Sequence, residues 1–286
     1  MTPEPRRLCI IGLGLMGASL ALAVRSRYPH ITGVARREVT ARQALARGVV
    51  DAATTDFDAG VSDADLVVLA TPVRTLVSQL PWVGSAARSG AVVTDLGSTK
   101  AEIVRAMDRL PDRLFAVGSH PMCGKEVAGL DAAEPGLYRG KTWILTRTAR
   151  TTDAAFAAVR QLAESAGAVT LELDPLRHDA LVAFASHLPY SVAVALVAAA
   201  DAAGLGDPAV WQVAASGFRD TSRLAASDVT MMLDILLTNA APVAGAIRDF
   251  QFSLDQLTAL LERKDEDGLR AYLAAAAQVR RDRVMR

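Results

Sequence analysis

Short apolar runs and amphipathic segments alternate along residues 1–174. The apolar runs are bounded by turn-forming residues, which predicts buried strands, and the segments between them carry apolar residues at helical spacing. Such alternation is typical of βαβ units around a parallel sheet. The predicted strands are residues 8–11, 31–35, 66–70, 92–95, 115–118, 143–146 and 169–173. The predicted helices are residues 16–27, 40–47 and 153–166.

The pattern changes around Asp174 and Pro175, after which only Ala-, Leu- and Val-rich helical patterns follow. We therefore expect an α/β domain over residues 1–174 and an all-helical domain over residues 175–286. The apolar helical faces of the second domain are too extensive for a small domain that packs only on itself. We expect these helices to form a dimerisation domain, and the protein to be a homodimer.

The most apolar part of the helical domain is residues 188–204, which include Pro189, Tyr190, Ser191 and Asp201. A membrane-spanning helix needs roughly 20 mainly apolar residues. Because polar residues and a proline interrupt this stretch, we expect a helix buried in the protein and no membrane association.

Charge and cysteine content narrow the possible partners and the compartment. Lys and Arg number 31, as do Asp and Glu, so no net field attracts nucleic acid or anionic lipid. Residues 1–7 lack the apolar core and cleavage site of a signal peptide. The two cysteines, Cys9 and Cys123, predict no disulfide framework. We expect a cytoplasmic protein, without a nucleic-acid partner, whose specificity comes from a local site.

A glycine-rich turn follows the first predicted strand and opens a helix. Its residues are Gly12, Leu13, Gly14, Leu15, Met16 and Gly17. The first glycine permits the tight turn, the second lets the backbone approach a pyrophosphate, and the third lets the helix pack closely on the strand. The free N–H groups of the helix N-terminus then face the phosphates. The sequence predicts a Rossmann-type dinucleotide-binding domain.

The end of the second predicted strand bears on the choice between NAD and NADP. NAD-binding sites usually place an acidic residue there to bind the ribose 2′-hydroxyl. This chain has Ala35, followed by Arg36 and Arg37. Without a carboxylate to repel a 2′-phosphate, the two arginines could bind it through charge-assisted hydrogen bonds. We expect NADP to be preferred over NAD; the alternative is that both arginines are simply solvated.

Later strand ends should face the nicotinamide, because ligands of such sheets bind beyond the carboxyl ends of the strands. Thr71 and Pro72 follow one strand, Ser98 follows another, and His120 follows a third. A neutral imidazole at His120 could take the proton from a hydroxyl whose carbon gives up hydride. Ser98 could hydrogen-bond the ring and fix its tautomer. The histidines show no metal-ligand spacing, and we predict no metal.

Four segments resemble the prephenate/arogenate dehydrogenase family of tyrosine biosynthesis. They are residues 95–100 (DLGSTK), 118–122 (GSHPM), 186–189 (SHLP) and 217–225 (GFRDTSRLA). The resemblance covers nearly the whole chain, in order. It implies oxidative decarboxylation of prephenate to 4-hydroxyphenylpyruvate, or of arogenate to tyrosine, with hydride transfer to NAD(P)+.

The resemblance also implies roles for single residues. His120 matches the family's catalytic histidine, Ser98 the serine that orients it, and Arg223 the arginine that holds a substrate carboxylate. Further matches that line or close the same pocket are Glu126, His187, Arg219 and Asp220.

One position departs from the family pattern, and two histidines have no expected role. Many members that use prephenate carry a second histidine three residues after the match to His187, where this chain has Tyr190. A tyrosine hydroxyl can still hydrogen-bond a carboxylate or an amine, so Tyr190 stays a candidate for substrate binding. We expect no functional role for His30, in an exposed loop, or for His178, near the start of a helix.

Two rival interpretations share this architecture. β-Hydroxyacid dehydrogenases and imine reductases also join a Rossmann domain to a helical one, but the hydroxyacid enzymes use a lysine on the first helices of the second domain. The only lysine after residue 175 is Lys264, in a late polar turn. The other rival is a catalytically silent NADP-binding, dimeric sensor, which would bind the cofactor without oxidising a dienol.

Overall fold

The computed structural model describes residues 6–125, 127 and 129–283. The chain divides into two compact units, Met1–Ala240 and Ala241–Arg286. The first unit holds the whole sheet and the helices that cover it, together with the first part of the helical region.

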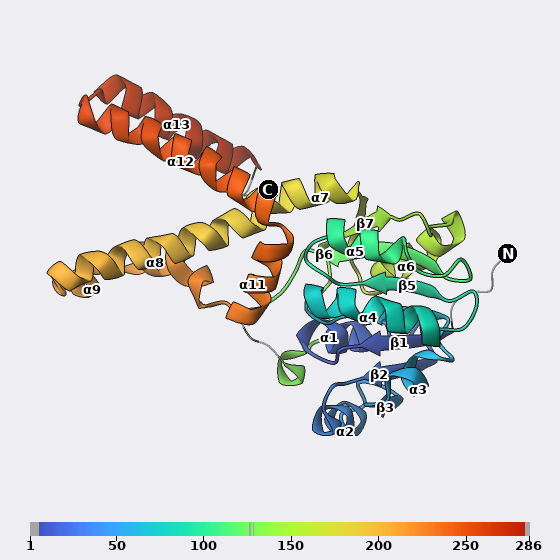
Figure 1. Cartoon of the computed structure of the whole chain (residues 1–286). Coiled ribbons are helices and arrows are strands. Elements are labelled where there is room, and N and C mark those ends of the chain that lie inside the picture. Colours follow the sequence, from blue (N-terminus) through green and yellow to red (C-terminus); the bar gives the residue numbers. More distant parts are fainter. Residues whose placement is uncertain (1–5, 126, 128, 284–286) are drawn as a thin grey trace. The chain divides into compact units, whose positions relative to one another are not determined.

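The strands of the described chain form a single sheet in the order β3-β2-β1-β4-β5-β6-β7-β8 (Figure 1). The strands are β1 (Arg7–Ile11), β2 (His30–Val34), β3 (Ala52–Thr54), β4 (Leu66–Leu69), β5 (Val92–Asp95), β6 (Phe115–Pro121), β7 (Thr142–Arg147) and β8 (Val169–Glu172). Seven of them match the predicted strands within a few residues. The edge strand β3 was missed because it has three residues and is only half-buried, so it leaves little hydrophobic pattern.

The sheet is not wholly parallel, which corrects the prediction. Strands β1 to β6 pair in parallel, but β7 runs antiparallel to β6, and β8 is parallel to β7. A parallel pair needs a crossover connection, usually a helix. The link between β6 and β7 contains only the short 3₁₀ turn η1 (Leu130–Ala132) among its described residues, so the chain folds back.

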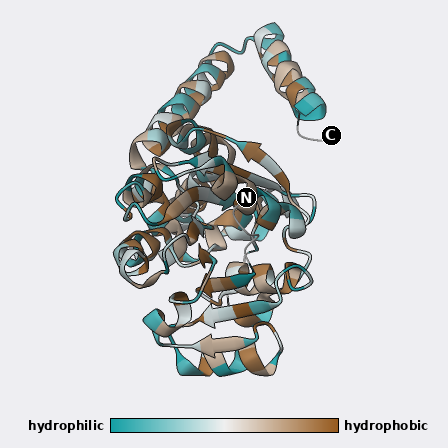
Figure 2. Ribbon diagram, turned by 90° about the vertical axis from the view of Figure 1, so that its right-hand side faces the viewer, coloured by the Kyte–Doolittle hydropathy of each residue, from teal (hydrophilic) through white to brown (hydrophobic). Residues whose placement is uncertain are grey.

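Helices cover both faces of the sheet. They are α1 (Leu15–Ala23), α2 (Glu38–Ala46), α3 (Phe57–Val61), α4 (Val73–Ala86), α5 (Ala101–Met107) and α6 (Asp153–Ser165). Alternate residues of β1 divide the core: Leu8 and Ile10 pack with α1, α2 and α6, whereas Cys9 and Ile11 pack with α3, α4 and α5. This alternation follows from the two-residue period of a strand, and Figure 2 shows hydrophobic colour along the strands.

Beyond the sheet the described chain is helical, as predicted. The elements are α7 (Pro175–Val182), the π-helical turn η2 (Ala183–His187), α8 (Leu188–Gly206), α9 (Ala209–Val213), α10 (Ser216–Ser222), the 3₁₀ turn η3 (Arg223–Ala226), α11 (Val229–Thr238), α12 (Ala240–Glu262) and α13 (Glu266–Arg283).

A wide turn joins α7 to α8. Pro189 has no N–H, so the carbonyl of the residue four positions earlier would lose its helical hydrogen bond in a regular α-helix. The π-helical turn η2 lies just before this proline, where a widened hydrogen-bonding pattern accommodates the break.

Helix α8 is mostly exposed within the single chain, which corrects the prediction of a buried helix. Ala193 is its one buried residue among those described, and Leu205 is 86% exposed. By length and composition alone, the helical stretch Pro175–Gly206 could cross a membrane, and 22% of its most apolar part is buried. The packing of this chain on itself therefore does not account for the apolar character of α8.

The second unit is a helical hairpin of α12 and α13. The turn between them holds Lys264 with a φ of 52°. The Asp265 side chain accepts a hydrogen bond from the Gly268 N–H at 2.9 Å, and the Tyr272 hydroxyl donates to the Ser253 carbonyl at 3.1 Å.

A fully buried ion pair lies beneath the carboxyl ends of β5 and β6. The Lys100 ammonium contacts the Asp95 carboxylate, and neither side chain has any exposed surface. The Asp95 carboxylate accepts the Ser119 N–H at 2.8 Å, and the ammonium donates to the Ser119 carbonyl at 2.7 Å. The pair thus holds both backbone polar groups of Ser119, the residue before His120.

We expect Lys100→Met to lower the free energy of unfolding by about 3–5 kcal/mol, because it leaves the Asp95 carboxylate buried without its counter-charge. The double variant Asp95→Asn with Lys100→Met should recover part of that loss. Urea unfolding followed by circular dichroism measures both. A loss below about 1 kcal/mol in the single variant would show that the pair does not stabilise the fold.

Candidate active site

The glycine-rich turn lies between β1 and α1, as predicted. Gly12 has a φ of 100°, and a Cβ on it would lie 2.8 Å from the Ala70 carbonyl oxygen. A Cβ on Gly17 would lie 2.0 Å from the Gly12 carbonyl oxygen. Both positions therefore require glycine for the turn to form at all.

Gly14 differs from its two neighbouring glycines. Its backbone is extended, at φ −83° and ψ −163°, and it is the N-cap residue of α1. No atom lies within 4 Å of the position that a Cβ would take there. The fold does not need this glycine, but it leaves open space in front of the first N–H groups of α1. These residues fit the pyrophosphate of a dinucleotide, which needs close approach to backbone N–H groups.

Other residues of the turn support it from behind. Leu13 and Leu15 are buried core residues, and the Leu13 side chain packs against Gly33 of β2. The Met16 carbonyl accepts a hydrogen bond from the Tyr138 hydroxyl at 2.6 Å. Any contact of Leu13 or Leu15 with a dinucleotide would therefore come from the backbone.

The remaining predicted cofactor residues lie beyond the ends of β2 and β4. Ala35 is buried, and its N–H donates to the Thr54 carbonyl at 3.0 Å. Arg36 and Arg37 are exposed. The Thr71 methyl lies close to Gly12, and its hydroxyl donates to the Gln79 amide oxygen at 2.7 Å. Pro72 is exposed and is the N-cap residue of α4.

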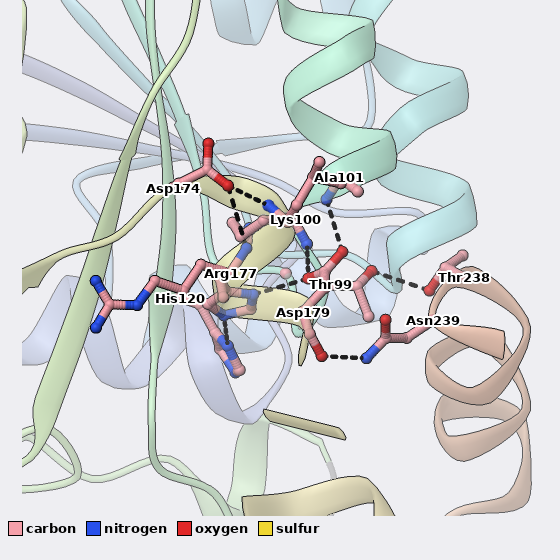
Figure 3. Close-up of polar contacts among 12 residues, drawn as sticks. Thr99, Lys100, Ala101, His120, Asp174, Arg177, Asp179, Thr238 and Asn239 are labelled. Atoms are coloured by element: carbon pink, nitrogen blue, oxygen red, sulfur yellow. Dashed lines mark hydrogen bonds and ion pairs between the residues drawn. The ribbon is translucent and has the colours of Figure 1, made fainter. Parts of the chain in front are cut away.

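His120 is the first of a chain of three hydrogen-bonded side chains. It lies near the end of β6 and is 8% exposed. Its Nδ1 lies 2.8 Å from Nε2 of His178, and Nδ1 of His178 lies 2.8 Å from the Asp179 carboxylate. Figure 3 shows His120 and Asp179 around this chain of contacts.

The order of donors in this chain follows from the carboxylate. An ionised carboxylate only accepts, so Nδ1 of His178 carries the proton that it donates to Asp179. Nε2 of a neutral His178 is then an acceptor, and Nδ1 of His120 donates to it. His120 is left with an unprotonated Nε2, and in the described part of the chain nothing hydrogen-bonds that atom.

Burial keeps the histidines neutral. The pKa of His120 is held well below its ordinary value of 6.5 by burial first, and then by His178, Lys100 and His187 nearby. Burial also lowers the pKa of His178, against the opposing effect of Asp179. Burial alone would raise the pKa of Asp179, but hydrogen bonds from His178, Ala101 and Lys100 lower it.

Asp179 fixes α7 against the sheet domain. Its carboxylate accepts the backbone N–H of Lys100 at 2.7 Å and that of Ala101 at 2.9 Å (Figure 3). These are the N–H groups at the start of α5, which a carboxylate satisfies well. Asp174 caps α7 itself by accepting the N–H groups of Leu176 and Arg177. Asp179 therefore both satisfies the N–H groups at the start of α5 and supports the ring of His178.

A third histidine is linked to Asp179 through Asn239. His187, in η2, is 1% exposed, and Nδ1 of its ring lies 3.1 Å from the side-chain amide nitrogen of Asn239. That nitrogen also donates to the Asp179 carbonyl at 2.8 Å. The neighbouring Thr238 and Thr99 hydroxyls are 2.9 Å apart and join the end of α11 to the loop after β5.

Some predicted site residues are not joined to this cluster. Ser98 is half-buried, and no described contact joins it to His120. Nδ1 of His120 is hydrogen-bonded to His178. A contact of Ser98 with the ring would therefore be at Nε2, and its orienting role stays a prediction. Tyr190 is half-buried on α8. Glu126 lies outside the described residues.

The predicted carboxylate-binding residues lie on α10 and η3, which pack on α8. Arg219, Asp220 and Arg223 are exposed. None of the described hydrogen bonds of the histidine cluster involves them. Among the residues that the structure describes, no group of three or more His, Cys, Asp or Glu is arranged to hold a metal ion; the absence of a metal stays a prediction.

The sequence analysis missed His178, Asp179 and Asn239. A histidine next to an aspartate, as in His178 and Asp179, can indicate a site. This pair contributes to the site only through His120, which is 58 residues away from His178. Asn239 gave no signal, because an asparagine at a helix end is ordinary. The contact of His178 with His120 places it in the hydrogen-bonded chain, and the expectation that it has no functional role stays untested.

Family models of prephenate dehydrogenase match most of the chain. The nucleotide-binding domain matches residues 20–172, and the dimerization domain matches residues 174–275. The chain belongs to the prephenate dehydrogenase family. The family resemblance and the fold class, a Rossmann-type α/β domain followed by a helical domain, are thereby confirmed.

Individual family members agree over nearly the full length. A prephenate dehydrogenase of Bacillus subtilis is 34% identical over 277 residues, covering 96% of this chain and 75% of the relative. A crystal structure of A. aeolicus prephenate dehydrogenase with hydroxyphenyl propionate and NAD+ has a TM-score of 0.91 at 33% identity, covering 99% of both chains. Synechocystis arogenate dehydrogenase has a TM-score of 0.84 at 31% identity, covering 97% of this chain and 100% of its own. These matches favour this family over the hydroxyacid dehydrogenases and imine reductases.

We expect Gly14→Ala to fold normally but to bind dinucleotide at least ten-fold more weakly, because its Cβ projects into the open space and meets only a ligand. Gly17→Ala is the matched contrast: its Cβ would clash with the turn and destabilise the free protein. Thermal unfolding and calorimetric titration with NADP and NAD measure the two effects. Unchanged dinucleotide affinity in Gly14→Ala would place the pyrophosphate elsewhere.

Proposed function

We propose that this protein is an NAD(P)-dependent dehydrogenase that oxidatively decarboxylates prephenate, arogenate or both. The observation that carries the proposal is His120, a buried neutral histidine at the carboxyl end of a dinucleotide-binding sheet, whose Nε2 has no hydrogen-bond partner among the described residues. The B. subtilis and Synechocystis relatives are named for these two substrates. An acceptor for a hydroxyl proton is what oxidation of a ring carbinol requires.

In this proposal Nε2 of His120 accepts the proton of the ring hydroxyl. The resulting imidazolium keeps its Nδ1–H bond to His178, and the Asp179 carboxylate behind His178 partly offsets the new positive charge. Oxidised nicotinamide dinucleotide, when bound, supplies the acceptor for the hydride. Loss of carbon dioxide then yields an aromatic ring, which makes the reaction effectively irreversible.

The substrate-binding residues remain predictions of the family resemblance. Arg223 is assigned to a substrate carboxylate, since a guanidinium matches it with two parallel hydrogen bonds. The residues assigned to the rest of the pocket are Glu126, His187, Tyr190, Arg219 and Asp220. The same resemblance assigns Ser98 to orienting His120, although Nδ1 of that ring contacts His178 and Nε2 is assigned to the substrate hydroxyl.

We also propose a homodimer formed through the helical domain, with the domain boundary at residues 174 and 175. Residues 174–275 match a dimerization domain, and Ala193 is the one buried residue of the apolar helix α8 within one chain. A second copy would remove that surface from water. Strand β8 ends at Glu172 and α7 begins at Pro175, which supports the boundary. We further propose a cytoplasmic location, as the sequence predicts.

The function is tested by assaying the purified protein with prephenate and with arogenate, following formation of the reduced nicotinamide. We expect turnover of at least one substrate, and we expect His120→Asn to lower kcat by about 10²–10⁴-fold while dinucleotide binding is retained. Turnover of the variant within a few-fold of wild type would remove His120 from the mechanism. No turnover with either substrate would refute the proposed function.

The same assay has a pH signature. His120 must be neutral to accept a proton, and its pKa lies well below 6.5. Activity is lost only as the pH falls through that lowered pKa, so kcat/KM should stay flat from pH 8 to pH 6.5 and decline at lower pH.

We propose that NADP is the preferred cofactor. Ala35 places no carboxylate beside the ribose, and Arg36 and Arg37 are exposed at the end of β2, where neither forms an ion pair with another described residue. An acidic residue there would repel a 2′-phosphate, whereas the arginines add an attraction that NAD cannot use. The A. aeolicus relative was crystallised with NAD+, so the preference is a property proposed for this chain's own residues.

We expect kcat/KM to be about ten-fold or more higher for NADP than for NAD, less the screening by salt at an exposed site. The variant Ala35→Asp with Arg36→Ala should reverse the preference. Assays of both cofactors at low and at physiological ionic strength measure this. Equal values for the two cofactors would mean that both arginines are simply solvated.

A further inference from the structure

The side chain of Asn239 bridges two groups of the site. Asn239 follows α11, is 2% exposed, and carries its amide nitrogen 2.8 Å from the Asp179 carbonyl and 3.1 Å from Nδ1 of His187 (Figure 3 shows its contact with Asp179). The reaction proposed above gives Asn239 no part, and neither does the family resemblance.

The Asp179 carbonyl determines which atom of the Asn239 side-chain amide, the nitrogen or the oxygen, lies beside it. A carbonyl oxygen only accepts hydrogen bonds, so the atom facing it is the amide NH₂ and not the amide oxygen. An NH₂ group has two protons, and the second is directed at Nδ1 of His187. Nδ1 must then be the unprotonated nitrogen of that ring.

The rest of the ring follows from its charge. Burial, partly offset by Asp179 and reinforced by His178, lowers the pKa of His187 to about 4, so the ring is neutral at pH 7. A neutral imidazole carries one proton, and with Nδ1 bare that proton is on Nε2. Among the described residues nothing hydrogen-bonds this Nε2, and it is not one of the buried side-chain atoms sealed without a partner.

We propose that Asn239 is a positioning residue that holds His187 as the neutral Nε2–H tautomer, which makes His187 a hydrogen-bond donor to a substrate oxygen. This inference rests on the proposed function for the identity of the substrate but not for the state of the ring. The two histidines then have opposite tautomers. His120 presents a bare acceptor nitrogen, and His187 presents an uncharged N–H donor.

With opposite tautomers, the two neutral rings can bind different groups of the substrate. An acceptor suits a hydroxyl that loses its proton, and a donor suits a carboxylate or carbonyl oxygen. If His187 had the other tautomer, its bare Nε2 would repel such an oxygen. The specificity of the pocket for an oxygen acceptor at this point therefore depends on a residue that does not touch the substrate.

The test is the protonation state of the His187 ring nitrogens, measured by NMR of protein labelled with ¹⁵N-histidine at pH 7, with resonances assigned by their loss in His187→Gln. We expect a bare Nδ1 and a protonated Nε2 in the wild type. In Asn239→Asp the new side chain can only accept, so Nδ1 should become protonated. In Asn239→Ala the ring should show a mixture of tautomers.

Kinetics of the same variants give the second readout. We expect KM for the accepted substrate to rise about ten-fold or more in Asn239→Asp, with a smaller change in kcat, because a substrate hydrogen bond is lost but His120 is retained. Thr238→Val is the matched control. It removes the neighbouring hydrogen bond to Thr99 at the same helix end and should leave both the His187 tautomer and KM unchanged.

A protonated Nδ1 in the wild type, or unchanged His187 resonances in both Asn239 variants, would overturn the inference. So would an equal rise in KM in Thr238→Val, which would indicate general loosening of the helix end. If Asn239→Asp fails to fold, Asn239→Ala and the wild-type spectrum still decide the question. The expected tautomer in a protein that turns over neither substrate would refute the proposed function and leave the tautomer assignment standing.

Discussion

The site depends on the placement of one buried residue, Asp179. Its carboxylate satisfies the first N–H groups of α5 and holds the ring of His178, and its carbonyl accepts the amide of Asn239. A carboxylate with this many donors stays ionised despite burial, which is the direction of its pKa. Asp179 therefore joins the sheet domain to the first helix after it. It also determines which ring nitrogens of the histidines carry protons.

The buried charged side chains near His120 and His187 do not include the groups that are proposed to contact the substrate. The buried charges are Lys100 with Asp95, below Ser119, and Asp179, behind His178, whereas the rings that face the open side are neutral. In a medium of low polarity, an ionised group attracts or repels over longer distances than in water. The formal charges therefore lie one residue behind His120, whose pKa is lowered mainly by burial and, among these charges, only by Lys100.

Elements that depend on local pattern were predictable from the sequence. The glycine turn, the buried strands and His120 at a strand end each follow from a few consecutive residues. The antiparallel β7 and the pairing of His120 with His178 could not be predicted, because both depend on how distant segments return to the sheet. The burial of α8 was wrongly predicted for a related reason: apolar composition predicts a covered helix, but it does not say whether the same chain would cover it.

The π-helical turn η2 gives the helix one more residue at that point than an α-helix would hold. Successive α-helical residues are rotated by about 100°, so the extra residue turns the whole of α8 by roughly this angle relative to α7. His187 closes the turn, and Tyr190 follows within the rotated part. The direction in which Tyr190 points relative to α7 thus depends on the extra residue in η2, the turn that lies just before Pro189. Deleting one residue from this turn would therefore rotate Tyr190 back by about the same angle relative to α7.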